Sequence, residues 1–274
     1  MTKIPFVKVE SLKNDFIIID EEVRVHWNAQ RARTICERRL GVGADGLIVL
    51  GPASADGIKF RLFNADGSRA EWSGNGVRGT AAYLAAMNPR RGDFHLLTKA
   101  GCVRVAVERR KQGGIIAEFM RPCPPVSPVP AAQRRRLQRL SGRAIGERVR
   151  YVDAGNPHWV LPVRHFRFDW ESVGRACQVL NPSTGGINFE VVRTHSRARI
   201  ELRIFERGVG PTPSSGSGAL AAVAACHDLG LVGDVVEVVS EGGSQRARVA
   251  ADNGAITLSA HARIMMAGVW SEGR

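Results

Sequence analysis

The chain has 274 residues, of which 44% are hydrophobic, and it carries a formal net charge of +13 at pH 7. This length and apolar content are enough to bury the core of one large domain or two medium ones. The five cysteines are odd in number, scattered and never spaced as Cys-x-x-Cys, so the sequence implies neither a disulfide framework nor a zinc site.

The N-terminal segment has no apolar run of signal-peptide length, and no stretch approaches the roughly 18 apolar residues of a membrane-spanning helix. We therefore expect a cytoplasmic protein without a membrane partner. Residues 6–9 and 16–20 predict two strands, with a turn at 11–14 between them.

The next segments alternate between helical and strand patterns. A basic amphipathic helix is predicted from Asn28 to Arg39, followed by a strand at 43–50. Residues 58–63 alternate as a strand that ends at Asn64. A helix then runs from Gly74 to about Met87. Residues 94–107 and 115–120 predict further strands.

Proline is concentrated in residues 122–130, which favours a linker over regular helix or sheet interior. The predicted division is an N-terminal half at 1–121, this linker, and a C-terminal half at 131–274 whose last strand packs back on the first half. Residues 131–150 are rich in arginine and partly helical in pattern. Because the remaining positive charge is spread over the chain, we expect an exposed basic face and no nucleic-acid role.

The second half begins with a strand at 148–153 that leads into Gly155-Asn-Pro-His158. A helix is predicted at 166–180, and Asn188 precedes another strand. The closing segments 235–240, 245–250, 256–258 and 263–266 alternate as strands. Many short strands and two long helices rich in Ala and Gly predict an α/β (α+β) fold.

The stretch from Arg203 to Cys226 predicts a strand, a loop rich in Gly, Ser and Pro, and a helix that begins at Gly216-Ser-Gly218. The first backbone N–H groups of a helix have no partner inside the helix and carry the positive end of its dipole. Glycines at that position let a carboxylate or phosphate approach closely. The stretch is therefore a candidate anion-binding junction.

A second copy of this junction runs from Arg61 to Leu84. The repeat offset, defined as the sequence separation between Arg61 and Arg203, also holds far outside the junction, which indicates that the chain is a duplicated half. The matching pairs are Arg61 and Arg203, Phe63 and Phe205, Asn64 and Glu206, Ser73 and Ser215, Gly74 and Gly216, Gly76 and Gly218, Asn14 and Asn156, and Gly101 and Gly243.

Two such halves facing each other would bring Ser73 and Ser215 to opposite sides of one cleft. A carboxylate held by two helix N-termini leaves its α-carbon between two side chains. One side chain can then remove a proton from one face while the other returns a proton to the opposite face. The duplication therefore predicts chemistry that inverts a carbon centre next to a bound carboxylate.

The chain resembles the diaminopimelate epimerase family over nearly its whole length. The resemblance rests on Asn14-Asp-Phe16, Leu40-Gly-Val-Gly-Ala-Asp45, Phe63-Asn-Ala-Asp-Gly-Ser68, Gly74-Asn-Gly76 with Arg78, Gly155-Asn-Pro-His158, Asn188, Glu206-Arg-Gly-Val-Gly210 and Gly216-Ser-Gly218. It implies two pseudo-symmetric halves, each a mostly antiparallel sheet wrapped around a central helix. It also implies a homodimer that interconverts LL- and meso-diaminopimelate, or a close diamino diacid, without pyridoxal phosphate, a metal or any other cofactor.

The resemblance also implies a substrate site. The non-reacting end of the substrate would lie on Asn64, Asn156, Asn188, Glu206 and Arg207, where a guanidinium pairs a carboxylate and a glutamate pairs an ammonium. The reacting carboxylate would lie on the backbone N–H groups of Gly74, Asn75, Gly216 and Ser217. Asn14 is implied as a further binding residue.

The chain departs from the family where the two catalytic cysteines are expected, because Ser73 and Ser215 occupy those positions. A hydroxyl is a far weaker acid than a thiol and needs an adjacent base, for which His158 and Asp15 are candidates. Gly46 also stands where the family usually has a substrate-contacting glutamine. These changes leave open a slower or re-tuned epimerase, a different isomerase or dehydratase, an amino-acid-binding protein, or an engineered Cys-to-Ser pair.

Overall fold

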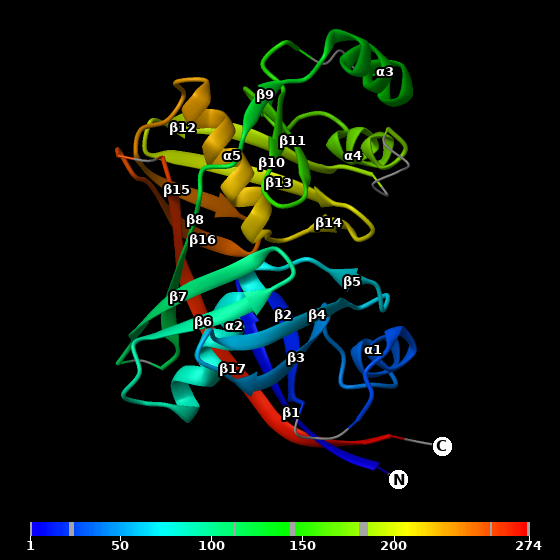
Figure 1. Ribbon diagram of the computed structural model, residues 1–274. Coiled ribbons are helices and arrows are strands. Elements are labelled where there is room, and N and C mark those ends of the chain that lie inside the picture. Colours follow the sequence, from blue (N-terminus) through cyan, green and yellow to red (C-terminus); the bar gives the residue numbers. More distant parts are fainter. Residues whose placement is uncertain are drawn as a thin grey trace. The chain divides into compact units, whose positions relative to one another are not determined.

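The computed structural model describes residues 2–21, 25–111, 113–142, 146–180, 186–252 and 254–272. The chain forms two compact units (Figure 1). Unit 1 comprises Met1–Met120 and Ser259–Arg274, and unit 2 comprises Arg121–Leu258. The proline-rich segment 122–130 thus belongs to unit 2, and the last strand of the chain continues into unit 1.

Unit 1 is built from strands that surround one helix. Its strands are β1 (Thr2–Ser11), β2 (Asn14–Asp20), β3 (Gly46–Ala53), β4 (Ile58–Asn64), β5 (Arg69–Ala70), β6 (Asp93–Thr98), β7 (Gly101–Arg109) and β8 (Ile115–Arg121), joined by the greater part of β17 (Ile256–Glu272). Hydrogen-bonded neighbours follow the order β17, β1, β2, β3, β4, β6, β7, β8, and β8 pairs with β17 again. The strands therefore close into a ring.

The helix inside this ring is α2 (Gly74–Met87). Almost all its residues from Gly74 to Ala85 are buried, and a helix buried on all sides belongs in a core rather than on a surface. Its small Ala and Gly residues let the surrounding strands approach closely. At its C-terminal end, one nitrogen of Arg109 donates to the carbonyls of Ala85, Asn88 and Arg91 at 3.1 Å each.

The outer face of the unit 1 sheet is covered by α1 (Ala29–Cys36). Asn28 caps the helix by accepting a hydrogen bond from the backbone N–H of Arg31, and the helix buries one face formed by Ala32, Ile35 and Cys36. This face packs on alternate residues of β2, β3 and β4. The outer layer of the core contains Ile17, Ile19, Leu47, Val49 and Phe63 from these strands.

Unit 2 repeats this plan around α5 (Gly216–Asp228), drawn in gold in Figure 1. Its strands are β9 (Val126–Pro128), β10 (Arg150–Asp153), β11 (Pro157–Val163), β12 (Asn188–Ser196), β13 (Arg199–Glu206), β14 (Gly210–Thr212), β15 (Val235–Ser240), β16 (Gly243–Val249) and the first residues of β17. The outer helices are α3 (Ala131–Ser141) and α4 (Trp170–Gln178). These helices pack on a core that includes Trp159, Leu161, Phe189, Val191 and Phe205.

The strand register of the two units coincides at the repeat offset. The parallel pairs β2–β3 and β11–β12 correspond, as do the antiparallel pairs β3–β4 with β12–β13 and β6–β7 with β15–β16. Examples are Phe16↔Gly46 with His158↔Asn188, Leu47↔Phe63 with Phe189↔Phe205, and Asp93↔Ala106 with Val235↔Arg248. The predicted fold of two alike halves, each a mostly antiparallel sheet around one helix, is confirmed.

Residues 122–130 include the short strand β9, Val126–Pro128, which pairs with β10 at the edge of unit 2, where a proline is tolerated. One local prediction was wrong. Residues 256–258 and 263–266 are not separate strands, because β17 runs without interruption from Ile256 to Glu272. The alternation of burial along β17 weakens after Ala262, which hid its continuity from the sequence pattern.

Candidate active site

Ser73 and Ser215 are the N-cap residues of the two central helices. Ser73 has φ −143° and ψ 127°, and its Oγ accepts a hydrogen bond of 3.1 Å from the backbone N–H of Gly76. Ser215 has φ −142° and ψ 130°, and its Oγ accepts one of 3.1 Å from Gly218. Serine is among the preferred residues for this position. The two hydroxyls are therefore held in the same local geometry.

The positive end of each helix N-terminus is not compensated from within the helix. Neither α2 nor α5 has an acidic residue in its first turn. Gly74 and Gly216 begin the helices, so their backbone N–H groups come before the first intrahelical hydrogen bond. Such a turn favours a bound carboxylate through its N–H groups and its dipole.

In unit 1, a chain of amide contacts supports the first turn of α2. The Nδ2 of Asn75 donates to Oδ1 of Asn14 at 3.3 Å, and Nη1 of Arg78 donates to Oδ1 of Asn75 at 3.0 Å. Arg78, also on α2, is fully buried, with its guanidinium carbon 4.9 Å from the centre of the Phe119 ring. Burial lowers the pKa of Arg78 to about 9. Asn14 therefore holds the side chain of Asn75 in place.

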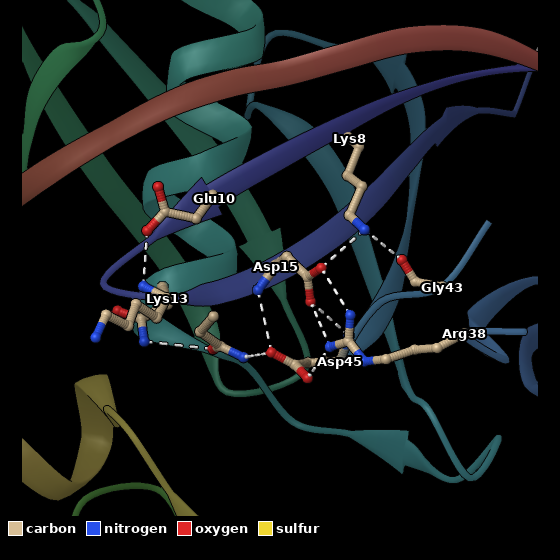
Figure 2. Close-up of polar contacts among 9 residues, drawn as sticks. Lys8, Glu10, Lys13, Asp15, Arg38, Gly43 and Asp45 are labelled. Atoms are coloured by element: carbon tan, nitrogen blue, oxygen red, sulfur yellow. Dashed lines mark hydrogen bonds and ion pairs between the residues drawn. The ribbon is translucent and has the colours of Figure 1, made fainter. Parts of the chain in front are cut away.

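Asn14 is anchored in turn by the ion cluster in Figure 2, which joins Lys8, Asp15, Arg38 and Asp45. Nδ2 of Asn14 donates to Asp45 at 2.7 Å. Asp15 lies 2.9 Å from Lys8 and 2.9 Å from Arg38, and it also accepts a hydrogen bond from the backbone N–H of Asp45 at 3.0 Å.

The cluster sets the protonation of Asp15. Burial by itself would raise the pKa of this carboxyl, but the hydrogen bonds and charges of Arg38 and Lys8 outweigh burial and lower the pKa to about 2. A carboxylate that binds a proton so weakly and already holds two cations is a poor general base. These contacts argue against Asp15 as the group that activates a serine and give it a structural role.

Asn64 lies at the end of β4, where the chain turns. Its Nδ2 donates to Oγ of Ser68 at 2.9 Å, and Ser68 donates to Asp66 at 2.6 Å. Among the residues that the structure describes, Oδ1 of Asn64 has no hydrogen-bond donor. The turn therefore leaves this amide with an acceptor to offer.

In unit 2, His158 is completely buried between two polar partners. Its Nδ1 lies 2.7 Å from Oε1 of Glu190, and its Nε2 lies 2.8 Å from Oδ1 of Asn156. Glu190 is also completely buried. Sequence reasoning missed Glu190, although a single carboxylate in the apolar run of β12 was a visible signal, since buried acids need a partner.

Asn188 joins two chain segments beside this pair. Its Nδ2 donates to the carbonyl of Pro157 at 3.0 Å, and its Oδ1 accepts from the backbone N–H of Arg207 at 2.9 Å. This second bond fixes the chain where β13 ends at Glu206. In unit 2 the structure thus brings Asn156, His158 and Glu190 together, and Asn188 with Arg207. The Oγ atoms of Ser215 and Ser217 lie 3.4 Å apart.

The cysteines lie away from both caps. Cys36, Cys177 and Cys226 are buried, and burial raises the pKa of Cys36 and Cys226 to about 12. Cys102 and Cys123 are exposed on other segments.

Within the described part of the chain, no group of three or more His, Cys, Asp or Glu side chains is arranged to hold a metal ion. In the same residues, no helix is long and apolar enough to cross a membrane.

Comparison with known proteins connects this geometry to a family. The family profile described as diaminopimelate epimerase matches residues 6–120 and 150–266. A diaminopimelate epimerase of Carboxydothermus hydrogenoformans is 33% identical over 247 residues, which cover 87% of this chain and 89% of that protein. One of Magnetococcus marinus is 35% identical over 243 residues, covering 87% of each chain.

Solved structures agree on the fold. A structure titled as a predicted epimerase from Pseudomonas aeruginosa superposes with a TM-score of 0.75 at 18% identity, covering 97% of this chain and 98% of that one. A hydroxyproline epimerase from Agrobacterium vitis gives a TM-score of 0.64 at 14% identity, covering 98% and 91%. The family profile matches both halves of the chain, and the epimerases of Carboxydothermus hydrogenoformans and Magnetococcus marinus align over most of its length. The chain therefore belongs to the diaminopimelate epimerase family.

Proposed function

We propose that the chain interconverts LL- and meso-diaminopimelate, or a close diamino diacid, by proton transfer at the α-carbon without a cofactor. Ser73 serves one face of this carbon and Ser215 the other. The observation that carries the proposal is the matched pair of caps, which give both hydroxyls the same geometry at the N-terminus of a buried helix. Family membership supports the substrate.

The reacting carboxylate binds the backbone N–H groups at the starts of α2 and α5, which are those of Gly74, Asn75, Gly216 and Ser217. These donors and both helix dipoles stabilise the negative charge that grows on the carboxylate as the α-proton leaves. Asn14 contributes through Asn75, whose side chain it holds at 3.3 Å.

The other end of the substrate binds Asn64, Asn156, Asn188, Glu206 and Arg207. Arg207 pairs the distal carboxylate and Glu206 pairs the distal ammonium, because these charges are complementary. Asn64 offers an acceptor to the ammonium, since its Nδ2 is already bonded to Ser68. Asn188 fixes Arg207 through the backbone hydrogen bond of 2.9 Å. A substrate without a second amino-acid group makes none of these contacts and is therefore bound more weakly.

Before each turnover one serine loses its O–H proton to solvent, and its alkoxide oxygen then takes the α-proton while the electron pair of the broken C–H bond passes into the carboxylate. The other serine gives its O–H proton to the opposite face, which forms the new C–H bond and leaves that serine as the alkoxide until it regains a proton from solvent. A hydroxyl ionises less readily than a thiol, so we expect a slower reaction than a cysteine pair would give.

A second candidate function is recognition of diaminopimelate without turnover. One feature supports this alternative, namely that each serine oxygen already accepts a backbone hydrogen bond and is thereby a weaker base. Further parts of the proposal are a homodimer and a cytoplasmic location, as expected for a biosynthetic enzyme of this family. Light scattering of the purified protein tests the dimer, and fractionation of the source cells tests the location.

The deciding experiment is proton NMR in heavy water with LL- and meso-diaminopimelate as separate substrates. The native protein is compared with Ser73→Cys/Ser215→Cys and with Ser73→Ala/Ser215→Ala as the matched control. Deuterium at the α-carbon and formation of the other isomer with the native protein support the epimerase, provided that the alanine control does neither. Activity in the cysteine pair alone supports recognition without turnover. No exchange in any variant contradicts the proposed substrate.

Variants that lack only one of the two acid/base residues, at position 73 or at position 215, test the two-sided mechanism. They are made in the native protein or in the cysteine pair, whichever is active. Removal of one acid/base residue should stop epimerisation, while the remaining residue still exchanges the α-proton of one isomer. The two single variants should therefore label opposite isomers. Labelling of both isomers by each single variant would contradict the assignment of one serine to each face.

A further inference from the structure

Unit 2 contains a buried acid and a buried histidine at positions that are apolar in unit 1. At the repeat offset, His158 corresponds to Phe16 and Glu190 to Ile48. The register of the paired strands supports this match. All four side chains are buried. Since unit 1 folds around its helix with Phe and Ile, the shared fold does not require the charged pair.

The hydrogen-bond partners define the state of His158. A carboxylate oxygen and an amide oxygen can only accept hydrogen bonds, and His158 places one ring nitrogen against each, at 2.7 Å from Glu190 and 2.8 Å from Asn156. A neutral imidazole has a single N–H and satisfies only one of these acceptors. A doubly protonated ring beside an ionised Glu190 satisfies both contacts, whereas a neutral ring would need a protonated Glu190 as the donor to Nδ1.

The position of Glu190 suits a fixed negative charge. A Cβ added to Gly218 would lie only 2.7 Å from Oε1 of Glu190, so the carboxylate touches the first turn of α5, where the helix dipole is positive. Its other oxygen, Oε2, is buried and has no hydrogen-bond partner within the described residues. A buried carboxylate with one oxygen unsatisfied is costly for folding, which argues that it is retained for another reason.

The contact with His158 decides which end of the Asn156 amide is available. Because Oδ1 of Asn156 contacts the His158 ring, the Asn156 NH₂ group points away from the ring. This NH₂ group has no acceptor among the described residues. The corresponding Asn14 in unit 1 differs, since its NH₂ donates to Asp45 at 2.7 Å. Asn156 is thus the copy whose amide donors remain for a ligand.

We propose that Glu190 is a positioning residue for substrate binding. It keeps His158 doubly protonated, His158 holds the amide oxygen of Asn156, and the amide NH₂ of Asn156 thereby donates to the distal carboxylate of the substrate. This inference rests on the proposed function for its ligand, but the protonation of His158 can be tested without any ligand.

The ligand-free test is ¹⁵N NMR of the His158 ring in the full-length protein. We expect both ring nitrogens to be protonated at neutral pH in the native protein, and only one in Glu190→Gln, which removes the charge but keeps the shape. A singly protonated ring in the native protein would overturn the inference whether or not diaminopimelate is the substrate.

The ligand test is a mutant cycle read by titration calorimetry with meso-diaminopimelate. His158→Phe/Glu190→Ile copies the unit 1 residues and removes both buried charges together. We expect it to weaken binding about tenfold to hundredfold, as loss of a hydrogen bond to a charged group does. Asn156→Ala should have a similar effect, and the triple variant should bind no more weakly than either. Ile48→Val, at the corresponding position of unit 1, is the control and should leave the Kd unchanged.

The outcomes separate the two proposals. Independent, multiplying losses in the triple variant would show that Glu190 and His158 do not act through Asn156 and would overturn the inference. Absence of binding by the native protein and by Ser73→Cys/Ser215→Cys would count against the proposed function. In that case the NMR result alone supports or overturns the role of Glu190.

Discussion

Beside the first turn of the central helix, unit 1 has Ile48 and unit 2 has Glu190. The glycines that face them correspond as well: a Cβ on Gly76 would lie 3.3 Å from a methyl carbon of Ile48, and one on Gly218 would lie 2.7 Å from the carboxylate of Glu190. The two units share strand register, cap residue and cap geometry. The duplicated backbone therefore carries two different chemical environments.

The difference also extends to the asparagines beside the caps. Asn14 is held by an ion cluster of Lys8, Asp15, Arg38 and Asp45, whereas Asn156 is held by the buried pair of His158 and Glu190. The ion cluster is partly exposed to solvent, so its charges cost less to desolvate than those of a fully buried pair. A buried pair carries a large desolvation cost and is strongly coupled. The two units should therefore respond very differently to loss of a single charge.

The largest expected effect comes from breaking the buried pair. Glu190→Leu leaves His158 buried without its counter-charge, and we expect a loss of about 3–5 kcal/mol in the free energy of unfolding. His158→Phe/Glu190→Ile removes both charges and should stay within about 1.5 kcal/mol of the native protein, since apolar replacement of a buried pair is often neutral. Urea unfolding measures both. Equal losses in the two variants would contradict an ion pair.

The two glycines provide a matched comparison of packing. Gly218→Ala should destabilise the protein by about 2 kcal/mol, because the methyl group would overlap a carboxylate that His158 holds in place. Gly76→Ala should be nearly neutral, because a methyl end of Ile48 can move slightly and alanine favours the helix by up to about 1 kcal/mol. Thermal unfolding of both variants is the measurement. A larger loss of stability in Gly76→Ala than in Gly218→Ala would show that the Glu190 side chain moves aside easily.

Asp15 has no acidic counterpart in unit 2, where Pro157 occupies the matching position. Its pKa is lowered from 3.8 to about 2 in the folded protein, so its stabilisation is present above pH 4 and is lost as the pH falls through 2. This shift corresponds to about 2 kcal/mol.

We therefore expect Asp15→Asn to lower the free energy of unfolding by about 2 kcal/mol at neutral pH and by little near pH 2. Denaturant titrations at several pH values provide the measurement, with Asp56→Asn in an exposed loop as the control. A stability difference that does not change with pH would show that the loss at Asp15 is one of packing.

The smallest effect tests what the two units share. Ser73→Ala and Ser215→Ala each remove one cap hydrogen bond of 3.1 Å, and each should cost about 1 kcal/mol. Because the caps have the same geometry, the two losses should agree closely, apart from the weak 3.4 Å contact that Ser215 also makes with Ser217. Urea unfolding of both single variants provides the values. A clearly larger loss at one serine would mean that its hydroxyl has a structural partner that the other lacks.

Several features could be predicted from residue patterns because their causes are local. The repeat offset, the serines before glycine-rich helix starts and the buried Ala-rich helices follow from the order of residues alone. The family was also predicted from its motifs, and the profile and relatives confirm it. The roles of Ser73, Ser215 and the substrate-binding residues stay predictions.

Other features depend on partners that are distant in sequence. Asp15 meets Asp45 and Arg38, which lie on other segments, so its lowered pKa was invisible in the local pattern. Likewise, His158 and Glu190 are far apart in the chain and become neighbours through the parallel pairing of β11 with β12. The sequence contained both residues but not their contact.

The sequence by itself determined the duplication, the helix starts and the serines that precede them, because repeats and caps are set by neighbouring residues. The tertiary structure decided which polar groups form hydrogen bonds within the protein. Parallel strand pairing places His158 beside Glu190, and burial then forces the two to pair, since an unpaired charge in the core is too costly. This pairing makes the difference between Asn156 and Asn14. The amide donors of Asn156 have no acceptor among the described residues, whereas the Asn14 amide is hydrogen-bonded through both its nitrogen and its oxygen.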